Sequence, residues 1–594
     1  MNTPLSISTA SNQTFLNIST WIRRCEVEHA RCTYFRNKAS WYPSRLLYVG
    51  TQGNTTVRLV RGGQNIAHGQ TYMTLSHRWG AYKVPTLSTK TITAWNEGLS
   101  IKALPKTFQD FITLARFLQV RYVWIDSLCI IQEGDSGADW RSEGLTMDRV
   151  YRSSYCNISA DWGSDKRGLF FQRDLRMLDK PRVDLRVKKE PNWDSIVTEE
   201  VQMVESEFWE DPVSKSPLST RGWVVQERWL SLRNIRFSPR EIFFECNQHA
   251  LCERFPEYLP QVLSEGDNTL KAIFSESQMQ NITSTISVTA IPGTPIYNAW
   301  HEVLSRYSQC YLTFASDRLI AFAGIAKFFQ EIMGDKYIEG LWLRNLAYDM
   351  MWFRDLNIAT PVIEGHNDRL RLFERDIPGQ YRAPSFSWAS TGVPIKPPSR
   401  LNSNLGFLVT VKCVKFRRSP NLPVEEITED VFGPMLSPTT EVMVVGSLRR
   451  MRLLPYFNGY QRELYVAPDN PDVDLQNLED GSKNIPREIA AANLDFQILS
   501  DDIATWTSKK SLYYMPWQDH WDPRLEDSLI KHKNFTCLLL ELVDSRMSRF
   551  RRIGRLFGEV KRLRDLYFAP QEDESTLPCV HYDASTKQHT IYII

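Results

Sequence analysis

Between residues 71 and 160 the sequence alternates between strand-like and helix-like hydrophobic patterns, and this alternation constrains the fold more than any other feature. Three short runs are apolar enough to be buried strands, and the stretches between them carry apolar residues at helical spacing. Strands that alternate with helices are joined by right-handed crossovers and pair in parallel. The sequence therefore predicts an α/β fold with a parallel sheet. The predicted strands span 72–76, 122–126 and 156–160, and the predicted helices span 107–120 and 147–151.

Further elements are predicted on both sides of this core. A short helix over Trp21–Cys32 precedes it, and a helix over Arg221–Leu232 leads into a hairpin around Ser238 and Pro239. The hairpin strands are expected at 235–237 and 242–244, later helices at 297–307 and 317–329, and short strands from about residue 385 to the end.

The pattern divides the 594 residues into four segments. An N-terminal extension with a short helix takes residues 1–65, and the α/β core takes residues 66–255. Residues 256–296 show little pattern and are interpreted as a linker or insertion. Residues 297–594 are expected to form a mixed α+β C-terminal region.

The composition, 42% hydrophobic and 24% charged residues, is typical of a folded globular protein. A formal net charge of +2 gives no field that would draw the chain to nucleic acid or to a membrane, so neither is predicted as a partner. We expect the basic run at 546–564 to be a β-hairpin with a solvated face. The first twenty residues lack the apolar core of a signal peptide, and no apolar run is long enough to span a membrane. Ten scattered cysteines suit a reducing compartment, so we expect a cytoplasmic protein.

Polar side chains follow the first two predicted strands, at the edge where open α/β sheets bind ligands. Ser76 ends the first strand, and Arg78 and Trp79 follow it directly. Asp126 ends the second strand, and Gln132 lies slightly further on. Parallel strands present their carboxyl ends at one edge, so these side chains are expected to lie close together.

A third polar cluster lies on the helix predicted over 221–232. Trp223, Gln226 and Glu227 are spaced at i, i+3 and i+4 and therefore share one helical face, and Arg221 begins the helix. A carboxylate beside tryptophans in a cleft can have a perturbed pKa and act on a substrate.

Four longer segments of the core carry a recognisable pattern. They are YMTLSHRWG (72–80), LPKTFQDFITLARFLQVRYVWIDSLCIIQ (104–132), MDRVYRSSYCNISA (147–160) and PLSTRGWVVQERWLSLRNIRFSPREIFFEC (217–246). In this order and spacing they resemble the segments of the fungal heterokaryon incompatibility (HET) domain. Later segments at 312–326, 340–342, 383–390 and 550–554 resemble the region that commonly follows this domain. One position departs from the pattern, because Ile131 stands where the family often has Asn.

The resemblance implies a flavodoxin-like core, distantly similar to Toll/interleukin-1 receptor (TIR) domains, some of which cleave NAD. It also implies a protein of nonself recognition that triggers growth arrest or cell death. NAD is then the expected substrate, and no further cofactor is predicted. Cleavage of the nicotinamide–ribose bond passes through an oxocarbenium-like state that a carboxylate can stabilise.

On this hypothesis the carboxylate of catalytic Glu227 stabilises this oxocarbenium-like state or holds the ribose hydroxyls, and Asp126 assists by holding a ribose hydroxyl. Arg78 and Arg221 are expected to bind the pyrophosphate. Trp79 or Trp223 is expected to stack on a base. The remaining predicted substrate-binding residues are Ser76, Gln132 and Gln226.

Alternatives remain open for the same residues. A buried ion pair between Glu227 and an arginine is nearly as well supported as the catalytic role. Asp126 can instead cap the next segment through its side chain. The whole domain can also be a non-enzymatic signalling module that self-associates or docks on a protein partner. His77 and Cys129 suggest a cysteine hydrolase, but the apolar neighbours of Cys129 should raise the pKa of its thiol.

Two segments have spacings that suggest metal ligands. Cys25, His29 and Cys32 form one group, and Cys246, His249 and Cys252 form another. A structural zinc site needs four ligands, and neither group supplies them alone, although the two can combine. We therefore predict no metal site and expect these thiols to pack as small apolar groups.

Overall fold

The structure is a computed structural model of the 594-residue chain. It describes residues 5–30, 32, 41–64, 66, 69–79, 84–161, 167–174, 182–188, 196–202, 208–260, 263, 292–355, 382–398, 406–416, 425–426, 440–457, 462–468, 490–494, 510–520, 534–559 and 574–594.

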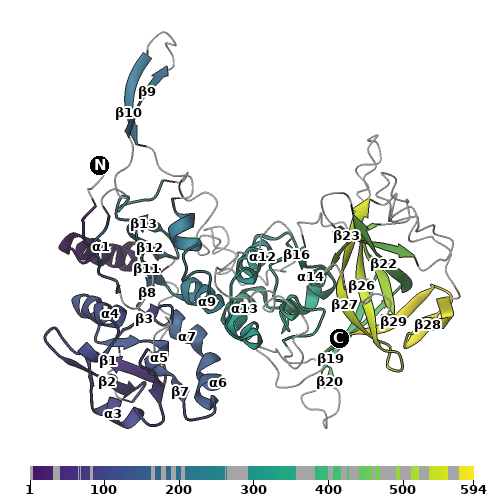
Figure 1. Ribbon diagram of the computed structural model, residues 1–594, viewed down its shortest axis with the longest axis horizontal. Coiled ribbons are helices and arrows are strands. Elements are labelled where there is room, and N and C mark those ends of the chain that lie inside the picture. Colours follow the sequence, from purple (N-terminus) through teal and green to yellow (C-terminus); the bar gives the residue numbers. More distant parts are fainter. Residues whose placement is uncertain are drawn as a thin grey trace. The chain divides into compact units, whose positions relative to one another are not determined.

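The chain forms two compact units (Figure 1). The first comprises Met1–Ser284 together with Ala321–Ile325, and the second comprises Thr285–Ile320 together with Ala326–Ile594. The polar residues predicted to form a site all belong to the first unit.

A nine-stranded mixed sheet forms the centre of the first unit. Four neighbouring strands are parallel, and antiparallel strands flank them on both sides. The parallel strands are β3 (Tyr72–Ser76), β6 (Tyr122–Trp124), β8 (Cys156–Ala160) and β11 (Arg233–Phe237). The flanking strands are β1 (Arg45–Tyr48), β2 (Thr56–Arg61), β5 (Leu99–Ser100), β12 (Ile242–Cys246) and β13 (Ala250–Cys252). The α/β prediction is therefore confirmed at this level.

The order of the parallel strands determines where the chain reverses direction across the sheet. The sheet runs β6-β3-β8-β11, which is second, first, third and fourth in chain order. The topological switch point therefore lies between β3 and β8, and crevices at such points are the usual ligand sites of open α/β sheets.

Helices cover both faces of the parallel strands. Residues Tyr72, Thr74 and Ser76 of β3 face one side, whereas Met73 and Leu75 face the other. The side of Ser76 meets α7 and α9, which also contact each other, and the side of Met73 meets α1 and α4. The helices of this unit are α1 (Asn12–Glu28), α3 (Ile92–Glu97), α4 (Lys106–Phe117), α5 (Asp126–Cys129), α6 (Ala138–Gly144), α7 (Met147–Arg152) and α9 (Gly222–Leu230). Two short strand pairs complete it: β4 (Leu87–Ser88) with β7 (Ile131–Glu133), and β9 (Arg182–Lys188) with β10 (Ile196–Gln202).

Several element boundaries were predicted correctly from hydrophobic periodicity. The strands at 72–76 and 156–160 are confirmed residue for residue, and both strands of the hairpin after α9 are present. The second strand stops at Trp124, because Asp126 begins the short helix α5. Helix α1 starts at Asn12 instead of Trp21, since the Ser11 side chain accepts a hydrogen bond from the Thr14 backbone N–H and caps it.

A row of polar side chains crosses the buried face of the parallel strands. Thr74 Oγ1 donates to Asn157 Oδ1 at 2.9 Å, and Asn157 Nδ2 donates to Ser76 Oγ and to Asn234 Oδ1, both at 3.0 Å. Asn234 Nδ2 in turn donates to the backbone carbonyl of Arg228 at 2.8 Å. This row, from Thr74 to Asn234, therefore ties strands β3, β8 and β11 to helix α9.

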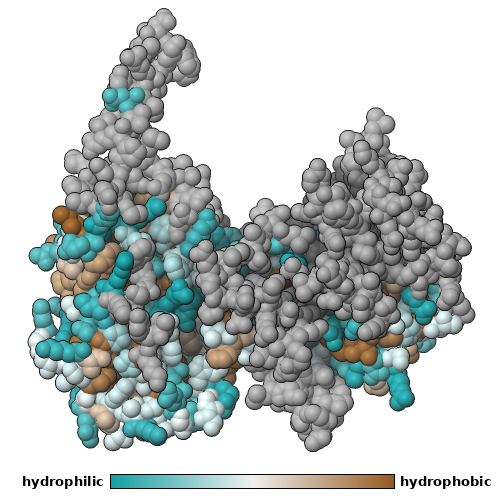
Figure 2. Space-filling view, in the orientation of Figure 1, coloured by the Kyte–Doolittle hydropathy of each residue, from teal (hydrophilic) through white to brown (hydrophobic). Residues whose placement is uncertain are grey.

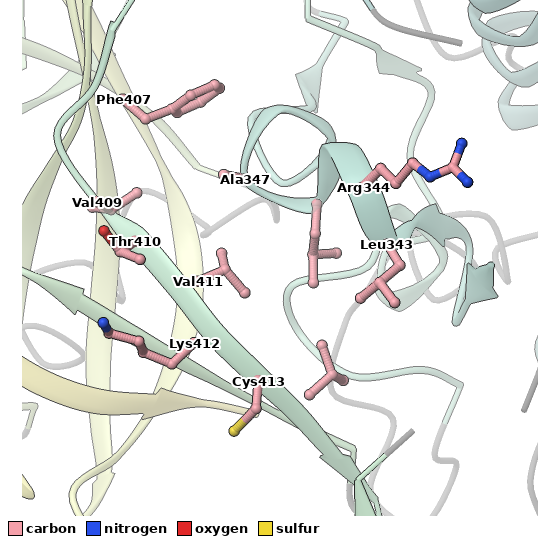
Figure 3. Close-up of a pocket in the computed structure, with 11 residues that line it drawn as sticks. Leu343, Arg344, Ala347, Phe407, Val409, Thr410, Val411, Lys412 and Cys413 are labelled. Atoms are coloured by element: carbon pink, nitrogen blue, oxygen red, sulfur yellow. The ribbon is translucent and has the colours of Figure 1, made fainter. Parts of the chain in front are cut away.

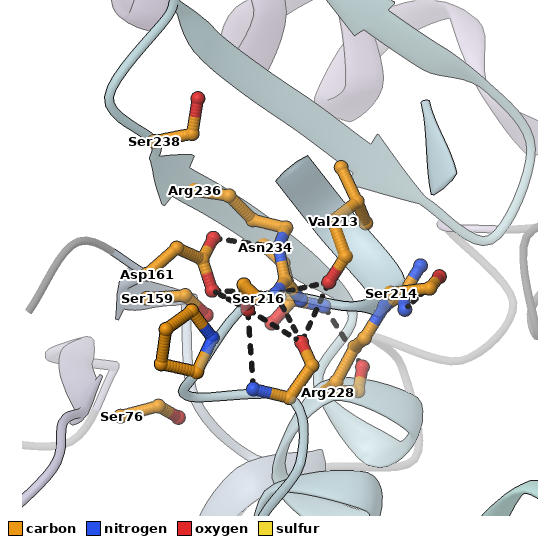
Figure 4. A network of polar contacts seen from close by, with 12 residues as sticks. Ser76, Ser159, Asp161, Val213, Ser214, Ser216, Arg228, Asn234, Arg236 and Ser238 are labelled. Atoms are coloured by element: carbon orange, nitrogen blue, oxygen red, sulfur yellow. Dashed lines mark hydrogen bonds and ion pairs between the residues drawn. The ribbon is translucent and has the colours of Figure 1, made fainter. Parts of the chain in front are cut away.

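A buried ion pair continues this face beyond the carboxyl end of β8 (Figure 4). Both Arg236 and Asp161 have fully buried side chains, and their two hydrogen bonds measure 2.6 and 2.9 Å. Arg236 also donates to the Val213 carbonyl, and Ser216 Oγ donates to Asp161 at 2.9 Å. Burial raises the pKa of Asp161 to about 6, although Arg236 acts to lower it.

The second unit combines helices with a twelve-stranded sheet. Its helices are α12 (Pro295–Ser308), α14 (Leu346–Asp349) and most of α13 (Ile320–Met333), of which Ala321–Ile325 are assigned to the first unit. Its short paired strands are β14 (Tyr337–Ile338), β15 (Leu341–Trp342), β16 (Phe353–Arg354) and β17 (Ile395–Lys396). The strands of the large sheet are β18 (Gly406–Phe407), β19 (Thr410–Phe416), β20 (Glu425–Glu426), β21 (Glu441–Gly446), β22 (Arg449–Phe457), β23 (Arg462–Pro468), β24 (Ala490–Leu494), β25 (Leu512–His520), β26 (Asn534–Asp544), β27 (Arg549–Glu559), β28 (His581–Asp583) and β29 (Gln588–Ile593).

The pairings of the large sheet close a ring. Strand β22 pairs with β25 and β23, β24 pairs with β23 and β27, and β26 pairs with both β25 and β27. The basic run at 546–564 enters this ring as β27. Its apolar residues Phe550, Ile553 and Leu556 are fully buried, as the prediction of a packed β structure requires. As far as Glu559, however, the run forms one strand of a hairpin with β26 and not a hairpin by itself, and Arg552 is buried as well. Residues 560–564 lie outside the described part of the chain.

The surface is mixed in character. Apolar and polar side chains are interspersed on the face of the first unit in view, as expected of a folded protein (Figure 2). Among the described residues, no helix has both the length and the apolarity that crossing a bilayer requires.

The Arg236–Asp161 pair generates a first prediction. Replacing Arg236 with Met leaves Asp161 buried without its partner, which we expect to destabilise the first unit by about 3–5 kcal/mol. Hydrogen exchange of peptides from β8 and β11 in the full-length chain measures this loss.

The double variant Arg236→Met/Asp161→Leu provides the control. It removes both charges and should recover most of the lost protection. A single variant as well protected as the parent protein would contradict the structural role of the pair.

Candidate functional site

The candidate site lies where β3 ends, beside the switch point of the sheet. Ser76, the last residue of β3, is 1% exposed and belongs to the polar row. Arg78 and Trp79 follow it and are exposed, as expected of residues on a ligand-binding rim. Buried Ser76 and exposed Arg78 and Trp79 therefore lie at the same edge of the sheet.

Helix α9 brings Glu227 to this edge. Arg221, in an extended conformation, is the N-cap of α9, and its guanidinium donates to the His77 carbonyl at 2.5 Å. One and a half turns later, Glu227 is 6% exposed and receives hydrogen bonds from the hydroxyls of Ser76 and Tyr151. The predicted approach of Glu227 and Arg221 to the loop after the first strand is present.

The environment of Glu227 holds its proton unusually tightly. Burial raises its pKa from 4.5 to about 7, and the charge of Asp126 adds to this rise. The Ser76 hydroxyl, the Arg221 charge and the Tyr151 hydroxyl each act to lower it but are outweighed. At neutral pH this carboxyl therefore exists in both protonation states.

The alternative that Glu227 is a buried ion-pair partner is not seen among the described residues. Arg228, the next residue on α9, pairs with Glu245 through two hydrogen bonds of 2.7 and 2.9 Å. Within the described parts of the chain, no arginine or lysine forms an ion pair with Glu227. Its carboxylate is buried among hydroxyl groups and faces Arg221 only across a longer distance.

Asp126 lies on the same edge, at the start of α5. Its Oδ2 accepts a hydrogen bond from Trp79 Nε1 at 2.9 Å, and His77 Nδ1 lies 3.9 Å from Oδ1. The side chain is 27% exposed, so solvent reaches it. Oδ1 also accepts from the Ser127 backbone N–H at 2.6 Å. Asp126 is nevertheless the first residue of α5 and not its N-cap, which is Ile125, and no side chain caps this helix, so the capping alternative is not what the structure has.

The other predicted residues have different surroundings. Gln132 donates to the carbonyls of Asp126 and Ile130, both at 3.3 Å, and so closes the turn after β6. Trp223 is half-buried and packs edge-on against Trp140, with ring centroids 5.9 Å apart. Gln226 is 1% exposed, and its Nε2 has no hydrogen-bond partner among the described residues.

Tyr151, Asn157 and Asn234 also belong to the site, and the sequence analysis did not identify them. Asn157 holds Ser76 in place, and Tyr151 contacts Glu227 directly. The sequence contains one signal, because Asn157 and Ser159 alternate with apolar residues in a strand expected to be buried on both faces. A buried strand with an amide on one face needs polar neighbours there.

The thiol of Cys129 is not an activated nucleophile. It is 2% exposed, and burial raises its pKa to about 12, as its apolar neighbours predicted. None of the site residues belongs to the group of metal-capable side chains in the described chain, which consists of Cys25, His29, Cys32 and Cys246.

A family model described as heterokaryon incompatibility protein (HET) matches residues 72–227. These residues form a HET domain. The match starts at the first residue of β3 and ends at Glu227, so it contains all the predicted site residues. The curated proteins and the solved structures contain no match to this chain.

A cavity in the second unit is separate from the HET-domain site (Figure 3). It has a volume of about 340 Å³ and lies between α14 with its preceding turn and β19. Its lining is mainly aliphatic, and its two cations, Arg344 and Lys412, have no acidic counterpart in the lining. It contains no residue predicted to act on a substrate.

The raised pKa of Glu227 predicts a pH-dependent stability. Between pH 4.5 and about 7 the folded protein keeps a proton that the unfolded chain has lost, so stability falls as pH rises through this range. Glu227→Gln removes this dependence. Relative to the parent, the variant should gain about 2–3 kcal/mol between pH 5 and pH 8.

Hydrogen exchange of peptides from α9 and β3 at both pH values measures the difference. Glu133→Gln, which changes an exposed acid of β7, is the control and should behave like the parent. An equal effect of Glu227→Gln at both pH values would show that the carboxyl titrates normally.

Proposed function

We propose that this chain acts in nonself recognition as a trigger of programmed cell death, and that its HET domain does so by hydrolysing NAD. The observation that carries the proposal is the carboxyl group of Glu227, buried beside Ser76 at the switch point with a pKa of about 7. The strand order β6-β3-β8-β11 is that of flavodoxin-like folds and supports the expected likeness to TIR domains. All ten cysteines are free thiols, in keeping with action in the cytoplasm.

The reaction breaks the bond between ribose C1′ and the nicotinamide nitrogen and forms a bond between C1′ and the oxygen of water. The electron pair of the broken bond leaves with nicotinamide, which departs as a neutral molecule, and the oxygen of water forms the new bond to C1′. Ionised Glu227 stabilises the oxocarbenium-like transition state, and the proton of the attacking water passes to a carboxylate and then to solvent. The products are nicotinamide, ADP-ribose and a proton.

The neighbouring side chains match the other parts of the substrate. Arg221 spends one N–H on the His77 carbonyl, and the rest of its guanidinium, together with exposed Arg78, can bind the pyrophosphate. Trp79 is 39% exposed and offers a stacking face, with half-buried Trp223 as the alternative. Asp126, held by Trp79, is the candidate for a ribose hydroxyl.

A second candidate function is a signalling module that acts by assembly with itself or with a protein partner. The low exposure of Glu227 and the pairing of Asp126 with Trp79 favour it, because a scaffold keeps such groups closed. On the enzymatic proposal, substrate binding must displace the Trp79 indole and uncover Glu227.

The central experiment measures nicotinamide release from NAD by the purified full-length chain. Glu227→Gln removes the charge that stabilises the transition state, so we expect its kcat to fall by about 100-fold or more. Asp126→Asn, which weakens ribose binding, should mainly raise KM.

Glu143→Gln is the matched control, since Glu143 is another buried acid of the same unit that lies near Arg45. Its kcat should stay close to that of the parent. If the Glu227→Gln variant leaves NAD intact but still causes cell death, the enzymatic proposal is rejected and the assembly proposal is supported.

The pH dependence of the reaction supplies an independent prediction. Ionised Glu227 is the active form, so kcat should rise with pH and level off above about 7. Ser76→Ala removes a hydrogen bond that lowers this pKa, so the midpoint of the rise should move to higher pH. Steady-state rates across the pH range test this, and an unchanged midpoint in Ser76→Ala would place the essential group elsewhere.

A further inference from the structure

Four sulfur and nitrogen side chains from two distant segments converge in the first unit. Cys25, His29 and Cys32 come from the N-terminal segment, and Cys246 is the last residue of β12. Their ligand atoms all lie within 4.8 Å of one another. The two groups, each incomplete by itself, therefore combine. The N-terminal group supplies three ligands, and the second group supplies the fourth.

Local structure explains how these residues meet. Cys25 and His29 are four positions apart at the end of α1, so they lie on one face of the helix. Helix α1 packs on β12, and Trp21 contacts Phe244 with ring centroids 5.9 Å apart. This packing carries the end of α1 to the end of β12, where Cys246 lies.

The separations fit a tetrahedral metal ion. Zinc bonds to thiolate sulfur at about 2.3 Å and to imidazole nitrogen at about 2.0 Å, which implies ligand-to-ligand separations of about 3.5–3.8 Å. Cys246 Sγ and His29 Nδ1 are 3.3 Å apart, and the upper limit of the group is 4.8 Å. Shifts of about 1 Å or less bring all four atoms to bonding distance.

Burial and polar neighbours support the same conclusion. The four side chains are between 0% and 3% exposed, so water is excluded from the group. Arg233 Nε lies 3.2 Å from Cys25 Sγ, and the His249 backbone N–H donates to Cys246 Sγ at 3.3 Å. Three thiolates and one Zn²⁺ leave a net charge of −1, which the guanidinium of buried Arg233 balances. Such contacts to sulfur are those that orient and tune metal ligands.

We propose that Cys25, His29, Cys32 and Cys246 bind one structural Zn²⁺ ion. Four protein ligands complete its coordination, so the ion has no open position for catalysis. Its ligands lie outside residues 72–227, on both sides of the HET match. The ion therefore fastens the segment before the HET domain to the strand after it, and stabilises α1 on the sheet.

The remaining two residues of the second group have other surroundings. Cys252 packs in an apolar cluster with Phe208, Trp209 and Phe243, as expected for a small apolar group. His249 places its ring 4.6 Å from that of His29 and contributes its backbone N–H to Cys246. Cys246 and Cys252, close in sequence and both buried, thus form a matched pair for a test.

The test measures the zinc content of the purified full-length chain by elemental mass spectrometry after expression with added zinc. We expect one zinc per chain for the parent and for Cys252→Ser, and loss of zinc to background for Cys246→Ser and Cys32→Ser. Glu227→Gln should keep its zinc, because the site is independent of the NAD proposal. A parent chain without zinc, or a Cys252→Ser variant that loses it as Cys246→Ser does, would overturn the assignment.

Spectroscopy keeps the test decisive if a cysteine variant fails to fold. Replacing zinc by Co²⁺ in the parent should give the intense d–d absorption of a tetrahedral site and a sulfur-to-cobalt charge-transfer band. His29→Cys should retain one metal per chain and strengthen that band by one additional thiolate. A weak octahedral cobalt spectrum, or a disulfide between Cys25 and Cys246 in protein prepared under reduction, would refute the proposal.

Discussion

The hydrogen-bonded row of side chains across the parallel strands is the constraint on which the candidate site depends. A buried amide without partners is costly, so Asn157 is tolerated only because Thr74, Ser76 and Asn234 satisfy it. A shift in strand register would break these bonds and turn the amide to the other face. The same row reaches α9 through the Arg228 carbonyl and so fixes the height of the helix above the sheet.

The two faces of the sheet therefore differ in polarity and in what they contribute to the protein. The face of Ser76 is polar, and it orients the acid and hydroxyl groups on which chemistry depends. The opposite face carries Met73, Leu75 and Ile158, and apolar burial there supplies the free energy that holds α1 and α4. At its edge, Arg233 contacts Cys25 of α1 and lies opposite Cys246 in the strand register. The N-terminal helix is thus part of the same compact unit as the HET match, although the family model begins after it.

Periodicity and spacing predicted the elements that a single stretch of chain specifies. The strands at 72–76 and 156–160 and the hairpin after α9 follow from local apolar patterns, and so does the common face of Gln226 and Glu227. Contacts set by sheet order were not predictable in this way. Strands β1 and β2 are short and half polar, and the place of β1 beside β6, with β2 next to it, depends on a partner distant in sequence. For the same reason, the sequence did not reveal that Tyr151 contacts Glu227 or that Cys246 joins the group around Cys25.

Two buried acids in the same unit show how differently a carboxyl group can be held. Asp161 is fully buried and makes a two-pronged contact with Arg236, which lowers its pKa although burial still raises it to about 6. Glu227 is nearly as buried but has no such contact. Its neighbours are the hydroxyls of Ser76 and Tyr151, the more distant charge of Arg221, and a second acid, Asp126, that disfavours its ionisation. If these hydrogen bonds were purely structural, a glutamine at position 227 would accept them from Ser76 and Tyr151 equally well, without the cost of burying a charge. The unpaired acid destabilises the fold at neutral pH, and such a cost is characteristic of groups whose ionised form acts on a substrate. The contrast between these two acids favours the catalytic proposal over the purely structural one.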